Sequence, residues 1–157
     1  MRMKIGIFGS RSLHDNRVKT LILEEMDRYN ADTIVTTQEP KGVCTVAQNV
    51  AKFEHYILEL HFLDFKYRAG AYEHRSDAVI AASDRILLIH DGISHGTRNE
   101  LARCKKAKIP YNYVILTPDE KEREIDNKLD SFVSLASDNA DSTDVDFDLA
   151  FEGWDDL

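Results

Sequence analysis

Short apolar runs alternate along the chain with longer segments in which apolar residues recur every three or four positions. The short runs are typical of strands buried on both faces of a sheet, and the longer segments have the spacing of amphipathic helices. We expect strands at residues 4–8, 32–37, 60–65, 85–90 and 111–116. We expect helices at residues 15–30, with Asp15 as the N-cap, and at 43–60, 71–83, 96–108 and 118–136.

Strands that alternate with helices predict an α/β fold with a mainly parallel sheet and helices on both faces. The right-handedness of the crossover connections favours a single Rossmann-like three-layer domain with five strands in the order 3-2-1-4-5. We assign this domain to residues 1–137 and treat residues 138–157 as an acidic C-terminal tail.

The composition is that of one ordinary globular domain, with 157 residues, 43% of them hydrophobic and 31% charged. No apolar run approaches the roughly 20 residues that span a bilayer, so we expect no membrane segment. The N-terminus lacks the apolar stretch of a secretory signal. Two cysteines, Cys44 and Cys104, do not make a disulfide framework. We therefore expect a cytoplasmic protein.

The net charge of −8 is unevenly distributed. Residues 138–157 hold eight acidic and no basic residues, which leaves 20 acidic residues against 20 Lys and Arg in residues 1–137. A neutral domain with an acidic tail is a poor nucleic-acid surface, so nucleic acid is an unlikely partner. Val145, Phe147, Leu149 and Phe151 recur at every second position in the tail, with acidic residues between them through Asp148, and Trp154 follows. Residues 145–154 are therefore either a docking motif for a protein partner or a solvated acidic segment.

Two loops are the unusual stretches of the chain. In a sheet of this order, ligands bind at the carboxyl ends of the strands where the order reverses, between the first and fourth strands. The loops that leave these strands are "GSRSLHD" (9–15) and "DGISHGT" (91–97). Both combine helix N-terminal amides, hydroxyls and glycine, which suit an anion, and an arginine can grip phosphate with two hydrogen bonds. The candidate ligand-binding residues are Gly9, Ser10, Arg11, Asp91, Gly92, Ser94, Gly96 and Thr97. The alternative is a tight turn and an ordinary helix cap.

The segments "GSR" (9–11), "RSDAVIAASD" (75–84) and "DGISHGTRNE" (91–100) together resemble the SLOG superfamily of Rossmann-like nucleotide-ligand-binding proteins. The resemblance covers roughly residues 3–116 and is strongest to the YpsA-like branch. The superfamily includes the Lonely-Guy phosphoribohydrolases, in which an arginine precedes the strand-opening aspartate by nine positions, as Arg75 precedes Asp84 here. The spacing of Ser94, Gly96 and Glu100 is also similar to that of nucleoside deoxyribosyltransferase-like proteins.

The resemblance implies a nucleotide or a nucleotide-derived, phosphate-containing ligand at the carboxyl edge of the sheet. It implies that Arg75 and Glu100 are the catalytic pair if turnover occurs, as an N-glycoside hydrolase that releases the base from a nucleoside 5′-monophosphate. The residues give an independent reason, because breaking this bond builds positive charge on the ribose, which a carboxylate can stabilise. A third alternative is an adaptor that acts through its acidic tail.

The six histidines do not form a metal signature, so we expect neither a metal site nor a cofactor. The helices at 43–60 and 71–83 carry more apolar residues than one sheet face can cover. These are Phe53, Tyr56, Ile57, Val79 and Ile80. We therefore expect a homodimer or a higher oligomer.

Overall fold

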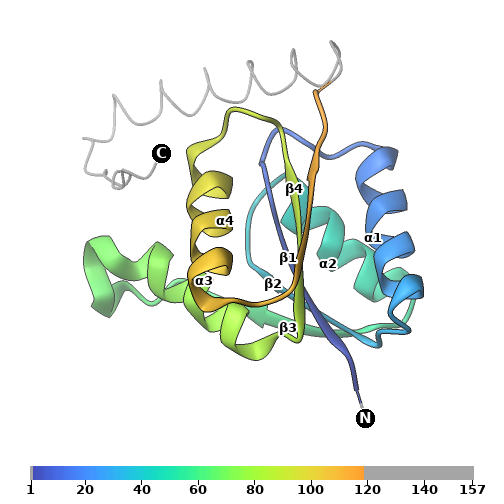
Figure 1. Ribbon diagram of the computed structural model, residues 1–157, viewed down its shortest axis with the longest axis horizontal. Helices are drawn as coiled ribbons and strands as arrows, with labels where there is room; N and C mark the ends of the chain where they lie inside the picture. Colours follow the sequence, from blue (N-terminus) through green and yellow to red (C-terminus); the bar gives the residue numbers. More distant parts are fainter. Residues whose placement is uncertain (1, 119–157) are drawn as a thin grey trace.

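The computed structural model describes residues 2–118, which form a five-stranded sheet with helices on both sides (Figure 1). The strands are β1 (Lys4–Gly9), β2 (Thr33–Thr37), β3 (Ile57–His61), β4 (Arg85–His90) and β5 (Tyr111–Ile115). The helices are α1 (Asn16–Arg28), α2 (Val43–Phe53), the short 3-10 helix η1 (Phe65–Gly70), α3 (Ala71–Ala82) and α4 (His95–Ala107). The expected helix at 118–136, apart from its first residue, and the whole acidic tail lie outside the described residues.

The sheet has the order β3-β2-β1-β4-β5, and all neighbouring strands are parallel, as the sequence predicts. Figure 1 shows α1 and α2 against one face and α3 and α4 against the other. Two apolar clusters fill the layers. Ile5, Ile7 and Leu87 point toward α1 and α2, whereas Phe8 and Leu88 point toward α3 and α4. This alternation is what a strand buried on both faces requires, and it confirms the Rossmann-like α/β fold.

The expected boundary between the second helix and the third strand is wrong. Helix α2 ends at Phe53 rather than at residue 60, and β3 spans Ile57–His61 rather than 60–65. His55 takes a left-handed backbone conformation with φ of 62°, which an α-helix cannot contain. The apolar residues that follow have a spacing that fits either a helix or a strand. They form a strand because they pair with β2. The η1 segment was not expected.

The apolar residues expected to form an oligomer contact divide into two groups. Val79 and Ile80 are buried within the α3/α4 layer, so they face the subunit's own sheet. Phe53 and Ile57 are exposed, and Tyr56 is partly buried. Of these five residues, only those on the α2–β3 side are therefore available for an oligomer contact. Among the described residues, no helix is long and apolar enough to cross a bilayer.

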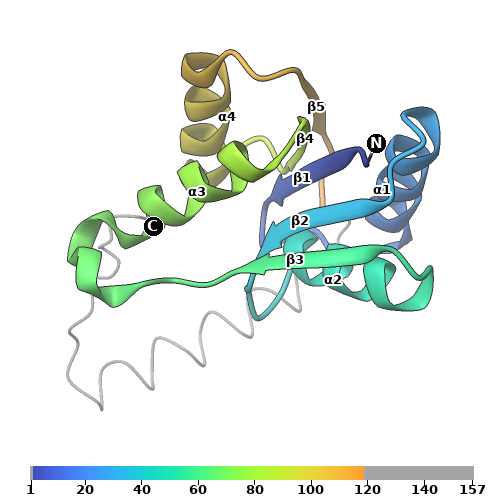
Figure 2. The same cartoon turned by 90° about the horizontal axis from the view of Figure 1, so that it is seen from below.

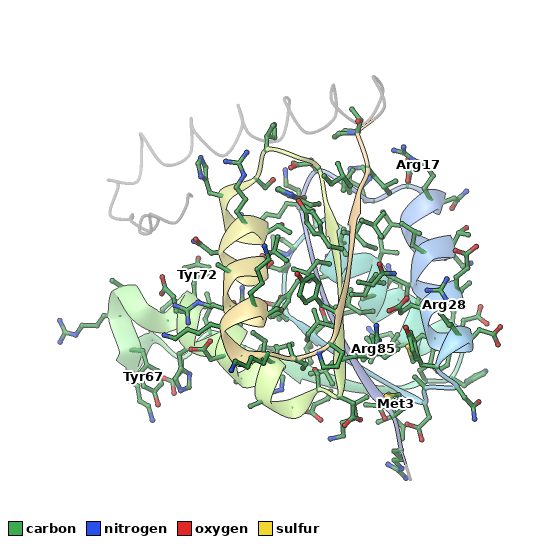
Figure 3. All side chains as sticks on the ribbon, in the orientation of Figure 1. Met3, Arg17, Arg28, Tyr67, Tyr72 and Arg85 are labelled. Carbon is green, nitrogen blue, oxygen red and sulfur yellow. The ribbon has the colours of Figure 1, made fainter. Side chains whose placement is uncertain are left out.

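A charged cluster closes the amino end of the sheet, far from the two candidate loops. Glu25 of α1 is 1% exposed and accepts hydrogen bonds from Arg28, at 2.9 Å, and Asn112, at 3.2 Å. Arg85 lies 3.6 Å from the other oxygen of Glu25 and 3.8 Å from the ring centroid of Tyr29. Figure 3 shows Arg28 and Arg85 together near α1. The cluster fastens α1 to β4 and β5, which is a structural role.

Candidate functional site

The two candidate loops meet at the carboxyl edge of the sheet. Strands β1 and β4 are adjacent, with Gly9 in register with Ile89, and the Ser10 amide donates to the Ile89 carbonyl over 3.0 Å. The chain leaves both strands at the same end, shown at the top of Figure 1. The strand order reverses between them, as the sequence predicts for a ligand-binding edge.

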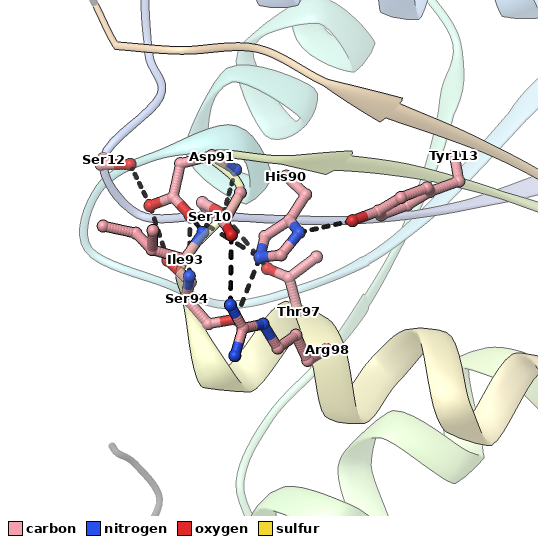
Figure 4. Close-up of polar contacts among 10 residues, drawn as sticks. Ser10, Ser12, His90, Asp91, Ile93, Ser94, Thr97, Arg98 and Tyr113 are labelled. Carbon is pink, nitrogen blue, oxygen red and sulfur yellow. Dashed lines mark hydrogen bonds and ion pairs between the residues drawn. The ribbon is translucent and has the colours of Figure 1, made fainter.

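Asp91 organises the β4–α4 loop. Its carboxylate accepts hydrogen bonds from the hydroxyls of Ser12 and Ser94, both at 2.7 Å, and from the amides of Ile93 and Ser94, at 2.9 and 2.8 Å (Figure 4). Burial alone would raise the pKa of Asp91, but these bonds outweigh it and lower the pKa below its usual range. Asp91 is therefore an ionised anchor, and with Ser94 it fixes the loop rather than presenting free oxygens.

Ser10, in the loop after β1, and Thr97, in the first turn of α4, connect the two loops through their hydroxyl groups. Both are 2% exposed, and their hydroxyl oxygens lie 3.3 Å apart. The Asp91 amide donates to the Ser10 hydroxyl over 3.0 Å. His90 continues the network, with its Nδ1 2.7 Å from the Tyr113 hydroxyl and its Nε2 3.0 Å from the Ser94 carbonyl (Figure 4). These hydroxyls position the first turn of α4.

The candidate glycines differ in what surrounds them. A Cβ on Gly9 would stand 2.3 Å from the Cβ of Val43, so packing against α2 accounts for this glycine. Gly92 has a φ of 93°, which the loop turn requires. A Cβ on Gly96, by contrast, would meet nothing within 4 Å. Gly96 is therefore the candidate glycine beside which a ligand would find open space.

An ion cluster lies at the same edge and is centred on Glu39, a residue that the sequence interpretation missed. Arg75 of α3 is 6% exposed and donates to the Gln38 carbonyl, at 3.1 Å, and to the Glu39 carboxylate. Arg11 approaches the other oxygen of Glu39 at 3.3 Å. The Tyr72 ring lies 5.5 Å from the Arg75 guanidinium. Glu39 thus bridges Arg11 of the loop after β1 and Arg75 of helix α3.

The Arg75 guanidinium is only partly satisfied. Its Nε atom is buried and has no hydrogen-bond partner among the described residues. A buried donor without a partner is uncommon and costs roughly 1–3 kcal/mol. This donor is the observation in the cluster that points most directly to a further acceptor.

Glu100 belongs to the same electrostatic group. It lies in α4, partly buried. Burial and the nearby charge of Glu39 raise its pKa to about 8, although Arg75 and Arg11 act in the opposite direction. At neutral pH the carboxyl group is therefore mostly protonated, and it can donate a hydrogen bond. The structure thus brings Arg11, Arg75 and Glu100 together.

Cys44 borders this group as a thiol. It is 3% exposed at the start of α2 and accepts a hydrogen bond from the Thr37 hydroxyl over 3.3 Å. Burial raises its pKa, and the negative charges of Glu39 and Glu100 raise it further. It is therefore unsuited to act as a nucleophile. Within residues 2–118, no group of His, Cys, Asp and Glu side chains is arranged to hold a metal ion.

Gly42 fastens the Glu39 loop to the Arg11 loop. It has a φ of 93°, and an added Cβ would stand 2.3 Å from the Arg11 Cα. We expect Gly42→Ala to lower the free energy of unfolding by about 2 kcal/mol, because the left-handed backbone and the backbone contact both resist a side chain. Gly70→Ala is the matched control, since nothing lies within 4 Å of its Cβ position and its φ is −85°. Urea denaturation should show no loss for Gly70→Ala, and equal effects in both variants would contradict the contact.

No protein-family model and no curated sequence matches the chain. A solved structure, the Moco Carrier Protein from Chlamydomonas reinhardtii, is similar over 83% of this chain and 86% of its own, with a TM-score of 0.52 and 15% identical residues. Similarity at this level of identity concerns architecture, and what it shows is a shared Rossmann-like fold.

Proposed function

We propose that this protein binds a nucleotide or a nucleotide-derived, phosphate-containing ligand at the carboxyl edge of its sheet, as a member of the SLOG superfamily. The observation that carries the proposal is the convergence of Arg11 and the buried, partly unsatisfied Arg75 at the β1/β4 switch point. Arginine is suited to phosphate because its donors match two phosphate oxygens at once.

Glu39 acts as an internal counter-ion in this proposal. It holds both arginines in the position in which they would grip an external anion. A phosphate group would replace the Glu39 carboxylate and use the same donors, and the protonated Glu100 would add no opposing charge at neutral pH. The Moco carrier has the same fold and a small-molecule cargo, which is compatible with binding without turnover.

Calorimetric titration of the full chain with AMP and with adenosine tests the proposal. We expect AMP to bind at least about tenfold more tightly than adenosine, because a charge-assisted phosphate contact is worth 1.4 kcal/mol or more. In Glu39→Gln the glutamine oxygen can still accept from Arg75 but no longer competes as an anion, so AMP affinity should rise. Equal affinity for AMP and adenosine, or no binding of either by both proteins, would overturn the proposal.

The second candidate function is N-glycoside hydrolysis of a nucleoside 5′-monophosphate. The pKa of about 8 favours it, because a protonated Glu100 can act as a general acid toward the departing base. This role differs from that of the charge-stabilising carboxylate that the sequence predicts, since Glu100 is mostly uncharged at neutral pH. Incubation with a panel of nucleoside monophosphates and chromatography for free base distinguishes the two functions. Base release that disappears in Glu100→Gln supports hydrolysis, and binding without release supports the ligand-binding function alone.

A further inference from the structure

Strand β3 forms one margin of the sheet and exposes apolar side chains. Within residues 2–118 it pairs with β2 and has no strand on its outer side, as Figure 2 shows. Ile57 is 42% exposed, Phe62 is 63% exposed, and Phe53 at the end of α2 is 77% exposed. A strand edge flanked by exposed apolar side chains is a site for pairing with another chain.

The hydrogen bonds to β2 fix which backbone groups point outward. The Ile57 amide donates to the Asp32 carbonyl, at 2.9 Å, and the His61 carbonyl accepts from the Gln38 amide, at 3.0 Å. Successive residues of a strand turn their polar backbone groups to opposite sides. Leu58 and Leu60 therefore direct theirs away from β2, toward the free edge, and Phe62, which directly follows the strand, would do the same once the strand is extended by pairing.

This edge is complementary to itself in one antiparallel register. With a two-fold axis at Leu60, residues 58 and 62 form hydrogen-bonded pairs with their counterparts, so that Leu58 lies opposite Phe62 of the second copy. In the same register Ile57 lies opposite Leu63, and Glu59 lies opposite His61, which is a pair of complementary polarity.

Shifting the axis by one residue loses this complementarity. An axis at Glu59 would set two glutamates directly opposite each other, which is destabilising. An axis at His61 would place Glu59 opposite Leu63. Within each chain Glu59 already contacts Lys4 at 3.0 Å and His61 at 2.9 Å, so the Leu60 register would join two such groups into one network.

We propose that two copies of this chain associate antiparallel through β3, with the two-fold axis at Leu60, to form one continuous ten-stranded sheet. A two-fold contact requires a surface that matches itself, and the apolar and charge pairing of residues 57–63 meets this requirement. Association through this edge would not require a bound ligand.

A single cysteine tests the register. In Leu60→Cys, the two thiols of a dimer lie on Cα atoms about 5.5 Å apart, within disulfide range. The native Cys44 and Cys104 are buried and unpaired. We expect full-length Leu60→Cys at low micromolar concentration to form a covalent dimer under mild oxidation. Ile115→Cys, exposed on the opposite edge strand β5, is the matched control and should not cross-link.

Sedimentation of the unmodified full chain completes the test. We expect a species of twice the chain mass, and at least a tenfold weaker association in Phe62→Lys, whose exposed side chain the subunit fold does not need. A dimer with a dissociation constant below roughly 100 µM would be largely associated at that protein concentration. A chain that is still monomeric there would overturn the proposal. So would cross-linking of Ile115→Cys as efficient as that of Leu60→Cys, or preferential cross-linking of Glu59→Cys.

Discussion

Replacing Arg75 by methionine is expected to lower the free energy of unfolding by about 3–5 kcal/mol and to weaken AMP binding at least 100-fold. The stability loss arises because removing one partner of a buried ion pair leaves the other charge uncompensated. Here Glu39, whose side chain is 14% exposed, would be left with Arg11 as its ion-pair partner, and Arg11 is more exposed than Arg75. The binding loss arises because Arg75 would supply the buried donor. Urea denaturation and calorimetry measure the two effects.

A double variant separates these two roles. In Arg75→Met with Glu39→Leu, both members of the pair become apolar, and such replacements are often neutral or stabilising. We expect the double variant to recover most of the lost stability and none of the AMP affinity. Recovery of both would mean that Arg75 acts only through the fold, and it would contradict a direct contact with phosphate.

Raising the pH is expected to destabilise the protein through Glu100. Its folded-state pKa of about 8 exceeds the ordinary glutamate value of 4.5, so the folded state holds this proton more tightly than the unfolded state. The contribution of the Glu100 proton to the free energy of unfolding is therefore fully present below pH 4.5, and it is lost as the pH rises through about 8. Each pKa unit corresponds to about 1.4 kcal/mol. Because Glu100 is partly exposed to water, we expect a loss of about 2–3 kcal/mol.

Glu100→Gln carries no titrating group and should remove this pH dependence. We expect it to be more stable than the natural chain at pH 9 and similar at pH 5, in thermal or urea denaturation. Glu24→Gln, on the exposed side of α1, is the control and should follow the natural chain at both values. A natural chain with equal stability at pH 5 and pH 9, after correction with this control, would refute the raised pKa.

The architecture could be predicted because its signals are local. Four of the strands are short apolar or β-branched runs set between helical spacings, and parallel crossovers leave few strand orders. The β3 boundary could not be predicted, because "HYILEL" suits either helix or strand and the left-handed His55 is invisible in the spacing.

The site was only partly predictable for a similar reason. The convergence of the loops after β1 and β4 follows from strand order alone, so Arg11 and Gly96 could be placed at one edge. Glu39 was missed because "QEPKG" has the composition of an ordinary loop. The available signal was its position directly after β2, the strand next to β1, whose carboxyl end reaches the same edge.

The backbone contact between Gly42 and Arg11 has a consequence for the rate at which a ligand could bind. The Val43 amide also donates to the Ser10 carbonyl over 3.2 Å, so the loops that carry Arg11 and Glu39 are joined through their backbones. An incoming anion would displace the Glu39 carboxylate by rotation of its side chain away from Arg75 and Arg11, and not by opening of a loop. Ligands would then associate at similar rates, and differences in affinity among them would appear as differences in residence time.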